Sequence, residues 1–185
     1  ITQEALEMVE SGSCLSSGKA TIVYNPQWHK GVVGIVASRL VEAYYKPTIV
    51  FTKSQEGLVT GSARSVHCFD LYGAIESCAD LLENFGGHLY AAGLTLKEEN
   101  LPEFCERIEK FISEAIIPEM QTPVVDVDAR LNFAQITPKF LRILKQFQPF
   151  GPGNSMPIFR TDNVYDNGRI RNAGAVGGHL KRERI

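Results

Sequence analysis

Three short segments place polar side chains directly beside glycine, a pattern suited to binding phosphate. They are WHKGVVG at Trp28–Gly34, GSARS at Gly61–Ser65 and FGGHLYAAG at Phe85–Gly93. Glycine lets a ligand approach the backbone closely, and a neighbouring serine, arginine or histidine supplies donors for phosphate oxygens. Each segment is expected where a strand meets a helix, and helix N-termini there carry free N–H groups that favour anions.

The arginine segment offers the most direct phosphate chemistry. In an extended chain residues i and i+2 share a face, so Ser62 and Arg64 are expected to point the same way. A hydroxyl beside a guanidinium group suits a phosphate, because arginine can make two parallel charge-assisted hydrogen bonds. The alternative is an edge-strand arginine in a surface ion pair, which is the commoner fate of a single arginine.

Two histidines accompany the other glycines. Gly86 and Gly87 are expected to follow a helix and to place His88 at the entry to the next strand, where it could donate to a phosphate oxygen or transfer a proton. His29 stands where a strand gives way to a helix. Both also have structural interpretations: His88 could be a buried histidine after a helix cap, and His29 an exposed residue at a tight packing joint.

No complete catalytic set is visible in the sequence. The four histidines form no HxH, HExxH or DHH cluster, and neither a Walker phosphate loop nor a GxSxG elbow occurs. Asp126 and Asp128 are interpreted as solvent-facing residues rather than a metal site. The four cysteines include no CxxC pair, which indicates free thiols in a reducing cytosol. We therefore expect a cytoplasmic chain that binds no metal itself.

Composition and charge indicate a soluble protein with two units. With 44% hydrophobic and 22% charged residues, the 185-residue chain can build a packed core, and it begins with no signal-peptide pattern. Residues 1–129 contain 9 Lys and Arg against 18 Asp and Glu, a balance of −9, whereas residues 130–185 contain 10 against 3, a balance of +7. The second part thus has the charge to meet an acidic polymer, although short basic segments are often only solvated surface.

Hydrophobic periodicity predicts an α/β (α+β) fold for the first part, a mixed sheet flanked by helices. The expected elements are the end of a helix at 4–10, strands at 19–24, 47–52, 58–63 and 89–96, and helices at 31–45, from the Asp70 cap to Glu83, and at 98–116. The segment Pro118–Pro123 is the expected boundary. Beyond it we expect a strand at 124–131, a helix at 138–148, a turn at 149–154 and a strand at 158–165.

These elements suggest a division into three parts. Residues 1–18 are interpreted as the end of an interdomain helix and a linker within a longer parent protein. Residues 19–122 form the sheet domain. Residues 123–185 form a β domain that is expected to be incomplete, because two or three strands cannot close a sheet or barrel.

Together, the glycine segments resemble the DHH-associated domain of the RecJ family of single-stranded-DNA exonucleases. WHKGVVGIVASRL (Trp28–Leu40), GSARS and FGGHLYAAG match that family in order and in rough spacing. PFGPGNSMPIF (Pro149–Phe159) and GGHLKRE (Gly177–Glu183) are similar to the opening of its oligonucleotide-binding (OB) domain. GGH followed by AAG is shared by several DHH-family phosphoesterases, whereas WHKGVVGI combined with PFGPGN is more specific to RecJ.

The resemblance implies the substrate-binding portion of a 5′→3′ exonuclease of DNA repair and recombination. A DHH domain outside this chain would hold the manganese or magnesium that activates water, and the isolated chain is expected to be inactive. Ser62 and Arg64 would bind the 5′-terminal phosphate. His88, in its turn with Gly86 and Gly87, would contact the scissile phosphate, and His29 is a further candidate for the same cleft.

The OB-like part would bind the following single strand by charge and by stacking. Charge would come from Lys139, Arg142, Lys145, Arg160, Arg169, Arg171, Lys181, Arg182 and Arg184. The aromatic residues Phe147, Phe150, Phe159 and Tyr165 could stack on bases or form core, and we expect core for at least two of them. Single-stranded DNA is the expected partner, other repair proteins are unnamed candidates, and a membrane is not expected.

Two other functions remain open on the sequence alone. One is a small DHH-family phosphodiesterase that acts on short oligonucleotides or cyclic dinucleotides, against which the OB-like extension argues. The other is a non-catalytic nucleic-acid-binding module similar to the C-terminal domain of alanyl-tRNA synthetase. Those proteins do not pair GSARS with PFGPGN.

Overall fold

The computed structural model describes residues 1–16, 18–55 and 57–164, and these form two compact units. The first unit is Ile1–Val124, and the second begins at Val125. Each unit is described by itself below. No helix of the described residues is long and apolar enough to cross a membrane.

The first unit is built on a five-stranded sheet with the strand order β1-β2-β3-β5-β4. The strands are β1 (Thr21–Tyr24), β2 (Thr48–Gln55), β3 (Leu58–Arg64), β4 (Leu82–His88) and β5 (Ala91–Lys97). β1 pairs parallel with β2, and the remaining neighbours pair antiparallel. The predicted mixed sheet flanked by helices is therefore confirmed.

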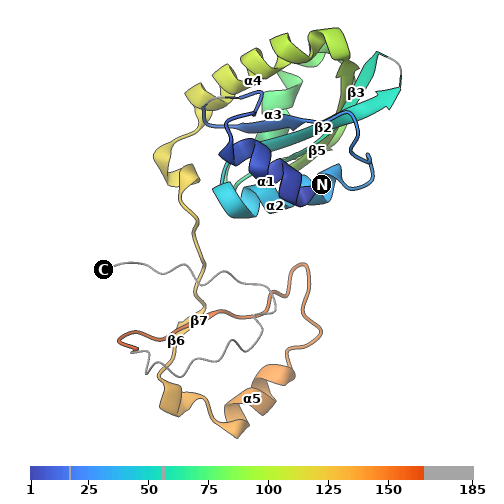
Figure 1. Ribbon diagram of the computed structural model, residues 1–185. Helices are drawn as coiled ribbons and strands as arrows, with labels where there is room; N and C mark the ends of the chain where they lie inside the picture. Colours follow the sequence, from blue (N-terminus) through green and yellow to red (C-terminus); the bar gives the residue numbers. More distant parts are fainter. Residues whose placement is uncertain (17, 56, 165–185) are drawn as a thin grey trace. The chain divides into compact units, whose positions relative to one another are not determined.

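Helices cover both faces of this sheet (Figure 1). α3 (Leu71–Glu76) and α4 (Leu101–Ala115) lie on one face, and α1 (Thr2–Glu10) and α2 (Val33–Tyr44) lie on the other. α4 packs because its buried residues recur at helical spacing, with Phe104, Ile108 and Ile112 beneath its charged outer surface. On the other face α2 buries Val36 and Leu40 against β2 and β3.

The predicted helix from Asp70 to Glu83 was wrong in its second half. The Asp70 side chain does cap a helix, since its Oδ1 accepts from the Gly73 N–H at 2.9 Å, but α3 ends at Glu76 and a short 3-10 turn, η1 (Ala79–Leu81), follows. Residues 82–88 then form β4, so the glycines at 86 and 87 lie inside a strand rather than after a helix. The following strand consequently begins at Ala91 instead of Leu89.

β4 could not be predicted from its residue pattern, for a physical reason. A register shift between Leu82 and Asn84 breaks the alternation of inward and outward residues, and Leu81, Leu82 and Phe85 happen to fit helical spacing. The deciding interaction is the pairing with β5, which lies later in the chain and satisfies the backbone groups of β4.

In the second unit the described elements are short. α5 (Pro138–Lys145) is capped by Thr137, whose hydroxyl accepts from the Phe140 N–H at 3.1 Å. The strands predicted at 124–131 and 158–165 reduce to the parallel pair β6 (Ala129–Arg130) and β7 (Phe159–Arg160). None of the described residues 125–164 is buried, so this part of the unit has no enclosed core.

Candidate nucleic-acid interface

Arg64 ends β3 with its guanidinium group held by neutral oxygens. Its Nη1 donates to the Ser62 hydroxyl at 3.0 Å and to the Ala63 carbonyl at 2.7 Å, so the two side chains do share a face. Among the described residues no carboxylate lies within 4.0 Å of Arg64, whereas Arg39 contacts one and Arg107 contacts two. The alternative of a surface ion pair does not hold here. A half-buried arginine with free N–H groups is therefore available to an anion.

The first turn of α2 lies directly against this pair. A Cβ atom at Gly34 would stand 3.0 Å from Arg64 Nη2 and 3.1 Å from Ser62 Oγ, which is tighter than most real Cβ contacts. Within the described chain, the N–H groups of Val33 and Gly34 have no hydrogen-bond acceptor, as expected of a helix start. The helix N-terminus thus adds partial positive charge beside the guanidinium group.

A pocket of about 380 Å³ opens along the same turn of α2. Its walls are residues of the helix and the strand end: Gly31, Gly34, Ile35, Ser38, Arg39, Glu42 and Arg64. This volume falls within the range of small-molecule sites, and it is larger than a single ion requires. The pocket can therefore hold part of a nucleotide.

Beyond Arg64 the same face of the sheet is open. Ser62 is paired with Gly93 on β5, and Gly93 is paired with Gly86 on β4, so glycines continue the row outward from Ser62. A Cβ atom at either glycine would meet nothing within 4 Å. Because α2 packs on β2 and β3, the backbone at Gly93 on β5 and at Gly86 on β4 is exposed. We call this exposed backbone the floor.

His88 stands at the end of this floor, in the next row of the sheet. Ala91 pairs with both Arg64 and His88, which places all three on one face. Two strand spacings of about 4.8 Å put the Cα atoms of Arg64 and His88 roughly 10 Å apart. His88 is exposed, and its ring has no hydrogen-bond partner in the described chain. The alternative of a buried His88 is therefore excluded.

The hairpin of β4 and β5, which carries His88, is fixed at its turn by backbone hydrogen bonds. In the turn, the Ser65 N–H donates to the Tyr90 carbonyl at 3.0 Å and the Leu71 N–H donates to the Leu89 carbonyl at 3.1 Å. Gly87 has φ +155°, and a Cβ atom there would lie 2.3 Å from the Ala91 carbonyl oxygen. Only glycine fits at this position.

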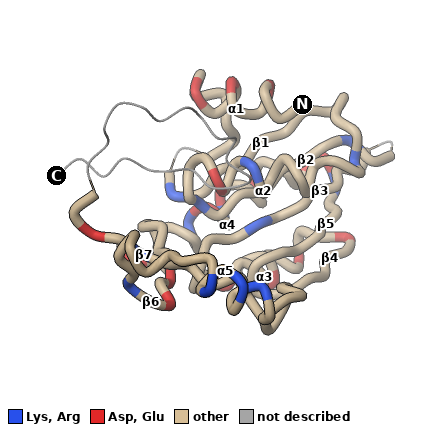
Figure 2. Tube along the Cα trace, turned by 90° about the horizontal axis from the view of Figure 1, so that it is seen from below, with Lys and Arg blue, Asp and Glu red and all other residues tan. Residues whose placement is uncertain are grey.

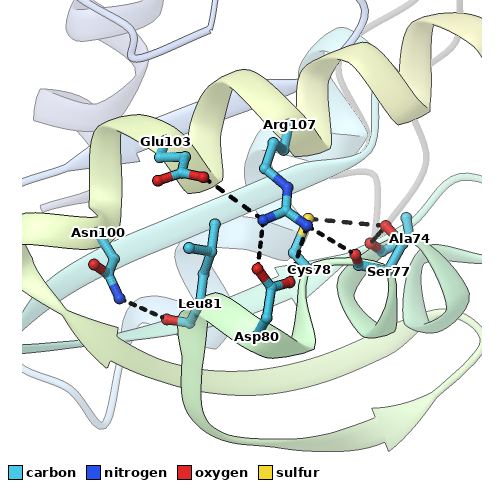
Figure 3. Close-up of polar contacts among 8 residues, drawn as sticks. All are labelled: Ala74, Ser77, Cys78, Asp80, Leu81, Asn100, Glu103 and Arg107. Atoms are coloured by element: carbon cyan, nitrogen blue, oxygen red, sulfur yellow. Dashed lines mark hydrogen bonds and ion pairs between the residues drawn. The ribbon is translucent and has the colours of Figure 1, made fainter.

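The segment that leads into β4, including η1, is anchored to α4 by Arg107 (Figure 3). Its guanidinium group donates to both oxygens of Asp80, at 2.7 and 2.9 Å, and to the Ser77 carbonyl at 3.4 Å. The hydrogen bonds from Arg107 lower the pKa of Asp80 below its ordinary value. Asn100 adds a hydrogen bond to the Leu81 carbonyl at 3.2 Å. This network positions β4 from the face opposite to Ser62 and Arg64.

Charge differs between the two faces of the sheet. The chain from Glu98 to Ala115, which includes α4, contains six glutamates against Arg107 and Lys110. Residues 1–10 and 30–53, which include α1 and α2, contain four Lys and Arg against four glutamates. Figure 2 shows these charges along the trace. A polyanion approaching the unit is therefore repelled less on the face of α1 and α2 than on the face of α4.

Two further residues, His29 and Arg39, lie beside or in this pocket. His29 is exposed and its Nδ1 accepts from the Gly31 N–H at 3.1 Å, so it borders the pocket through Gly31 without lining it. Arg39 does line the pocket and was not predicted. The signal available was its helical spacing: residues 31, 35, 39 and 42 recur at three or four positions along one side of a helix.

In the second unit the described cations Lys139, Arg142 and Lys145 lie on α5, and Arg160 forms an ion pair with Asp162 at 2.5 Å. Phe140, Phe147, Phe150 and Phe159 line one apolar hollow of about 360 Å³. Phe150 and Phe159 are half-buried, whereas Phe147 is 59% exposed. The remaining candidates lie outside the described residues: Tyr165, Arg169, Arg171, Lys181, Arg182, Arg184 and the segment 177–183.

Comparison with known proteins identifies both parts of the chain. A family model of the DHHA1 domain matches residues 17–114, and one of the RecJ OB domain matches residues 127–183. The single-stranded-DNA-specific exonuclease RecJ of Bacillus subtilis is 37% identical over 182 residues, covering 98% of this chain and 23% of that protein. The Escherichia coli exonuclease of the same name is 34% identical over 164 residues, covering 84% and 28%.

Solved structures agree with these relatives. RecJ of Thermus thermophilus in complex with Mn²⁺ superimposes with a TM-score of 0.68 at 30% identity, over 86% of this chain and 24% of that one. The same protein with Mg²⁺ gives 0.66 at 31% identity, over 85% and 25%. The chain belongs to the RecJ family, and it spans about a quarter of the length of the curated relatives it matches. Within the described residues no group of three or more His, Cys, Asp or Glu could hold a metal ion.

Proposed function

We propose that this chain is the part of a single-stranded-DNA exonuclease that holds the 5′ end of the substrate. Arg64 and Ser62 bind the 5′-terminal phosphate, with the N-terminus of α2 as a third source of positive potential. The neutral oxygens around Arg64 orient its guanidinium group without neutralising it. An oriented, uncompensated cation is suited to a phosphate dianion, because little reorganisation is needed on binding.

The observation that carries the proposal is the missing counter-ion of Arg64. The first unit is rich in carboxylates, yet the described residues provide none for this half-buried guanidinium group. Burial without a partner is costly for a charge, so such an arrangement favours an anionic ligand. The RecJ relatives, named as single-stranded-DNA-specific exonucleases, make a DNA phosphate the natural candidate.

The open floor gives the rest of the substrate a path. From the terminal phosphate the strand passes over Gly93 and Gly86, where a backbone can approach closely, and reaches His88. His88 contacts the scissile phosphate and stabilises charge there. His29 contributes at the mouth of the pocket. Manganese or magnesium is held by a DHH domain of the full protein, and the isolated chain is inactive without it.

The division of the chain follows the same logic. Residues 1–18 lead from the DHH domain, residues 19–122 hold the 5′ end, and residues 123–185 bind the following strand with the cations of α5 and Arg160. The basic balance of the second part supports this role. We expect its affinity to fall with salt, since phosphate contacts release counter-ions.

The discriminating experiment compares 5′-phosphorylated and 5′-hydroxyl oligothymidylates. Binding of the full protein is measured by fluorescence anisotropy in Ca²⁺, without cleavage. Arg64→Gln should weaken binding of the phosphorylated strand by about 1–3 kcal/mol, which is roughly 5- to 150-fold, and should leave the hydroxyl strand nearly unchanged. Ser62→Ala should act in the same direction with a smaller effect.

Lys53→Gln is the matched control for charge. Lys53 is exposed on β2 at the end of the sheet remote from Arg64, so its loss removes one positive charge without touching the site. It should change both strands equally and little. Equal losses on both strands in Arg64→Gln would show that Arg64 acts only through general attraction, and the terminal-phosphate role would be wrong.

A further inference from the structure

The outer side of α2 carries a second arginine that faces the pocket of Arg64. Arg39 and Glu42 both line this pocket, together with Ile35 and Ser38. Ile35 is 61% exposed, and the Arg39 side chain is 62% exposed. The helix therefore presents a cation, a hydroxyl and an apolar contact on the wall of a pocket for which Arg39 was not predicted from the sequence.

Arg39 differs from Arg64 in how its charge is balanced. Its Nη1 contacts Glu42 Oε2 at 2.7 Å, one turn along the same helix. Both partners are more than half exposed, and an ion pair of this kind contributes little to stability because water solvates both ions well. Glu42 is thus a counter-ion that a stronger anion can replace at low cost.

Arg107 provides the contrast on the opposite face. Its guanidinium group makes two hydrogen bonds to Asp80 and one to the Ser77 carbonyl, so its donors are committed to the fold. Arg39 has one contact through one nitrogen, and its remaining donors have no acceptor in the described chain. Of these two paired arginines, the one beside the pocket is the one free to bind a ligand.

We propose that Arg39 binds an internal phosphodiester near the 5′ end of the DNA, one or two linkages from the phosphate on Arg64, and that Glu42 is the counter-ion it exchanges for that phosphate. This inference rests on the proposed function, because it takes Arg64 as the site of the terminal phosphate. Ile35 offers an apolar surface to the intervening sugar. While the pair is intact, Glu42 competes with the strand for Arg39 and so opposes binding.

The test uses oligothymidylates in which one linkage at a time is a neutral methylphosphonate, from the first to the fourth position after the 5′ end. Binding of the full protein in Ca²⁺ is compared for wild type, Arg39→Gln and Arg64→Gln. Wild type should lose about tenfold in affinity when one particular linkage is neutral. Arg39→Gln should lose its sensitivity to that linkage and keep its preference for a 5′-phosphate. Arg64→Gln should show the reverse.

Glu42→Gln tests the counter-ion directly. It should bind the unmodified strand several-fold more tightly than wild type, and the double variant Arg39→Gln/Glu42→Gln should lose most of that gain. Glu103→Gln is the matched control, since Glu103 contacts Arg107 at 3.7 Å on α4 and carries the same charge. It should leave binding unchanged.

The outcomes separate the two proposals. If Arg39→Gln keeps the wild-type sensitivity at every linkage, or if Glu42→Gln binds no better than Glu103→Gln, the role of Arg39 is wrong whatever Arg64 does. If wild type shows no preference for a 5′-phosphate, the proposed function fails, and a linkage-specific effect of Arg39 would then mark an internal phosphate site alone.

Discussion

Replacing Gly93 by valine separates the proposed DNA path from the stability of the fold. Gly93 lies in the interior of β5, half way between Ser62 and Gly86, and the space above it is empty to at least 4 Å. Valine is a favourable strand residue, and β-propensity differences span about 1 kcal/mol, so the free energy of unfolding should stay equal or rise by up to ~1 kcal/mol. The added side chain would stand on the floor that the sugar-phosphate backbone is proposed to cross. We expect binding of a 5′-phosphorylated strand to weaken at least tenfold, which is about 1.4 kcal/mol.

The assay pairs urea unfolding with anisotropy on the same preparation. Thr95→Val is the control, because Thr95 lies two residues farther along the same face of β5, and the substitution hardly changes volume. It should bind as wild type does. If Gly93→Val is folded and stable and still binds as tightly as wild type, the strand does not pass over β5, and the reasoning from the open glycines is refuted.

The remaining predictions concern the hairpin and a titrating tyrosine. Gly87→Ala should lower the free energy of unfolding by about 1–3 kcal/mol, because its Cβ would meet the Ala91 carbonyl at 2.3 Å, whereas Gly86→Ala should not; equal stability of the two in urea would contradict this. Burial, with the hydrogen bond to Glu98, raises the pKa of Tyr24 to about 12. Because the unfolded phenol ionises near ~10, the fold favours the neutral form, so this contribution is present below pH 10 and is lost between pH 10 and 12. Tyr24→Phe should remove that part of the alkaline loss in urea titrations, and an unchanged pH profile would show that Tyr24 is not its source.

Much of the first unit follows from local sequence. The strands at β1, β2 and β3 and the helix α2 were predicted because their apolar residues alternate or recur at helical spacing over continuous stretches. The Asp70 cap could also be predicted, because it depends on a side chain and a backbone amide that are only three residues apart. β4 was missed because its extended conformation depends on pairing with β5 and on the hydrogen bonds from Arg107 to Asp80. Neither interaction is local in the sequence.

The site shows the same limit. That Ser62 and Arg64 share a face follows from strand geometry and needs no tertiary information. The placement of His88 in the neighbouring row depends on the hairpin register, and Gly34 over Arg64 depends on how α2 crosses the sheet. Sequence motifs indicated which residues to examine. The missing counter-ion of Arg64 could be recognised only in three dimensions, whereas the pair of Arg39 with Glu42 follows from their spacing of three residues on the predicted helix.

In the second unit the strands predicted from the sequence were longer than those in the structure. Val125 and Val127 alternate with aspartates and suggest a half-buried strand, yet both are exposed, and pairing is limited to Ala129–Arg130. Alternation predicts a strand only where a partner and a covering layer exist. The predicted PFGPGN turn is closed by two backbone hydrogen bonds between Gly151 and Asn154, and Asn154 Nδ2 also donates to the carbonyls of Phe147 and Pro149, at 2.8 and 2.9 Å.

In the proposed function, a guanidinium group without a carboxylate partner receives the end of a DNA strand. The most direct measurement is a crystal structure of the full protein with a 5′-phosphorylated oligothymidylate in Ca²⁺. We predict the terminal phosphate within hydrogen-bond distance of Arg64 and Ser62, with the strand running over Gly93 towards His88. A terminal phosphate bound elsewhere, with Arg64 contacting only protein, would contradict it.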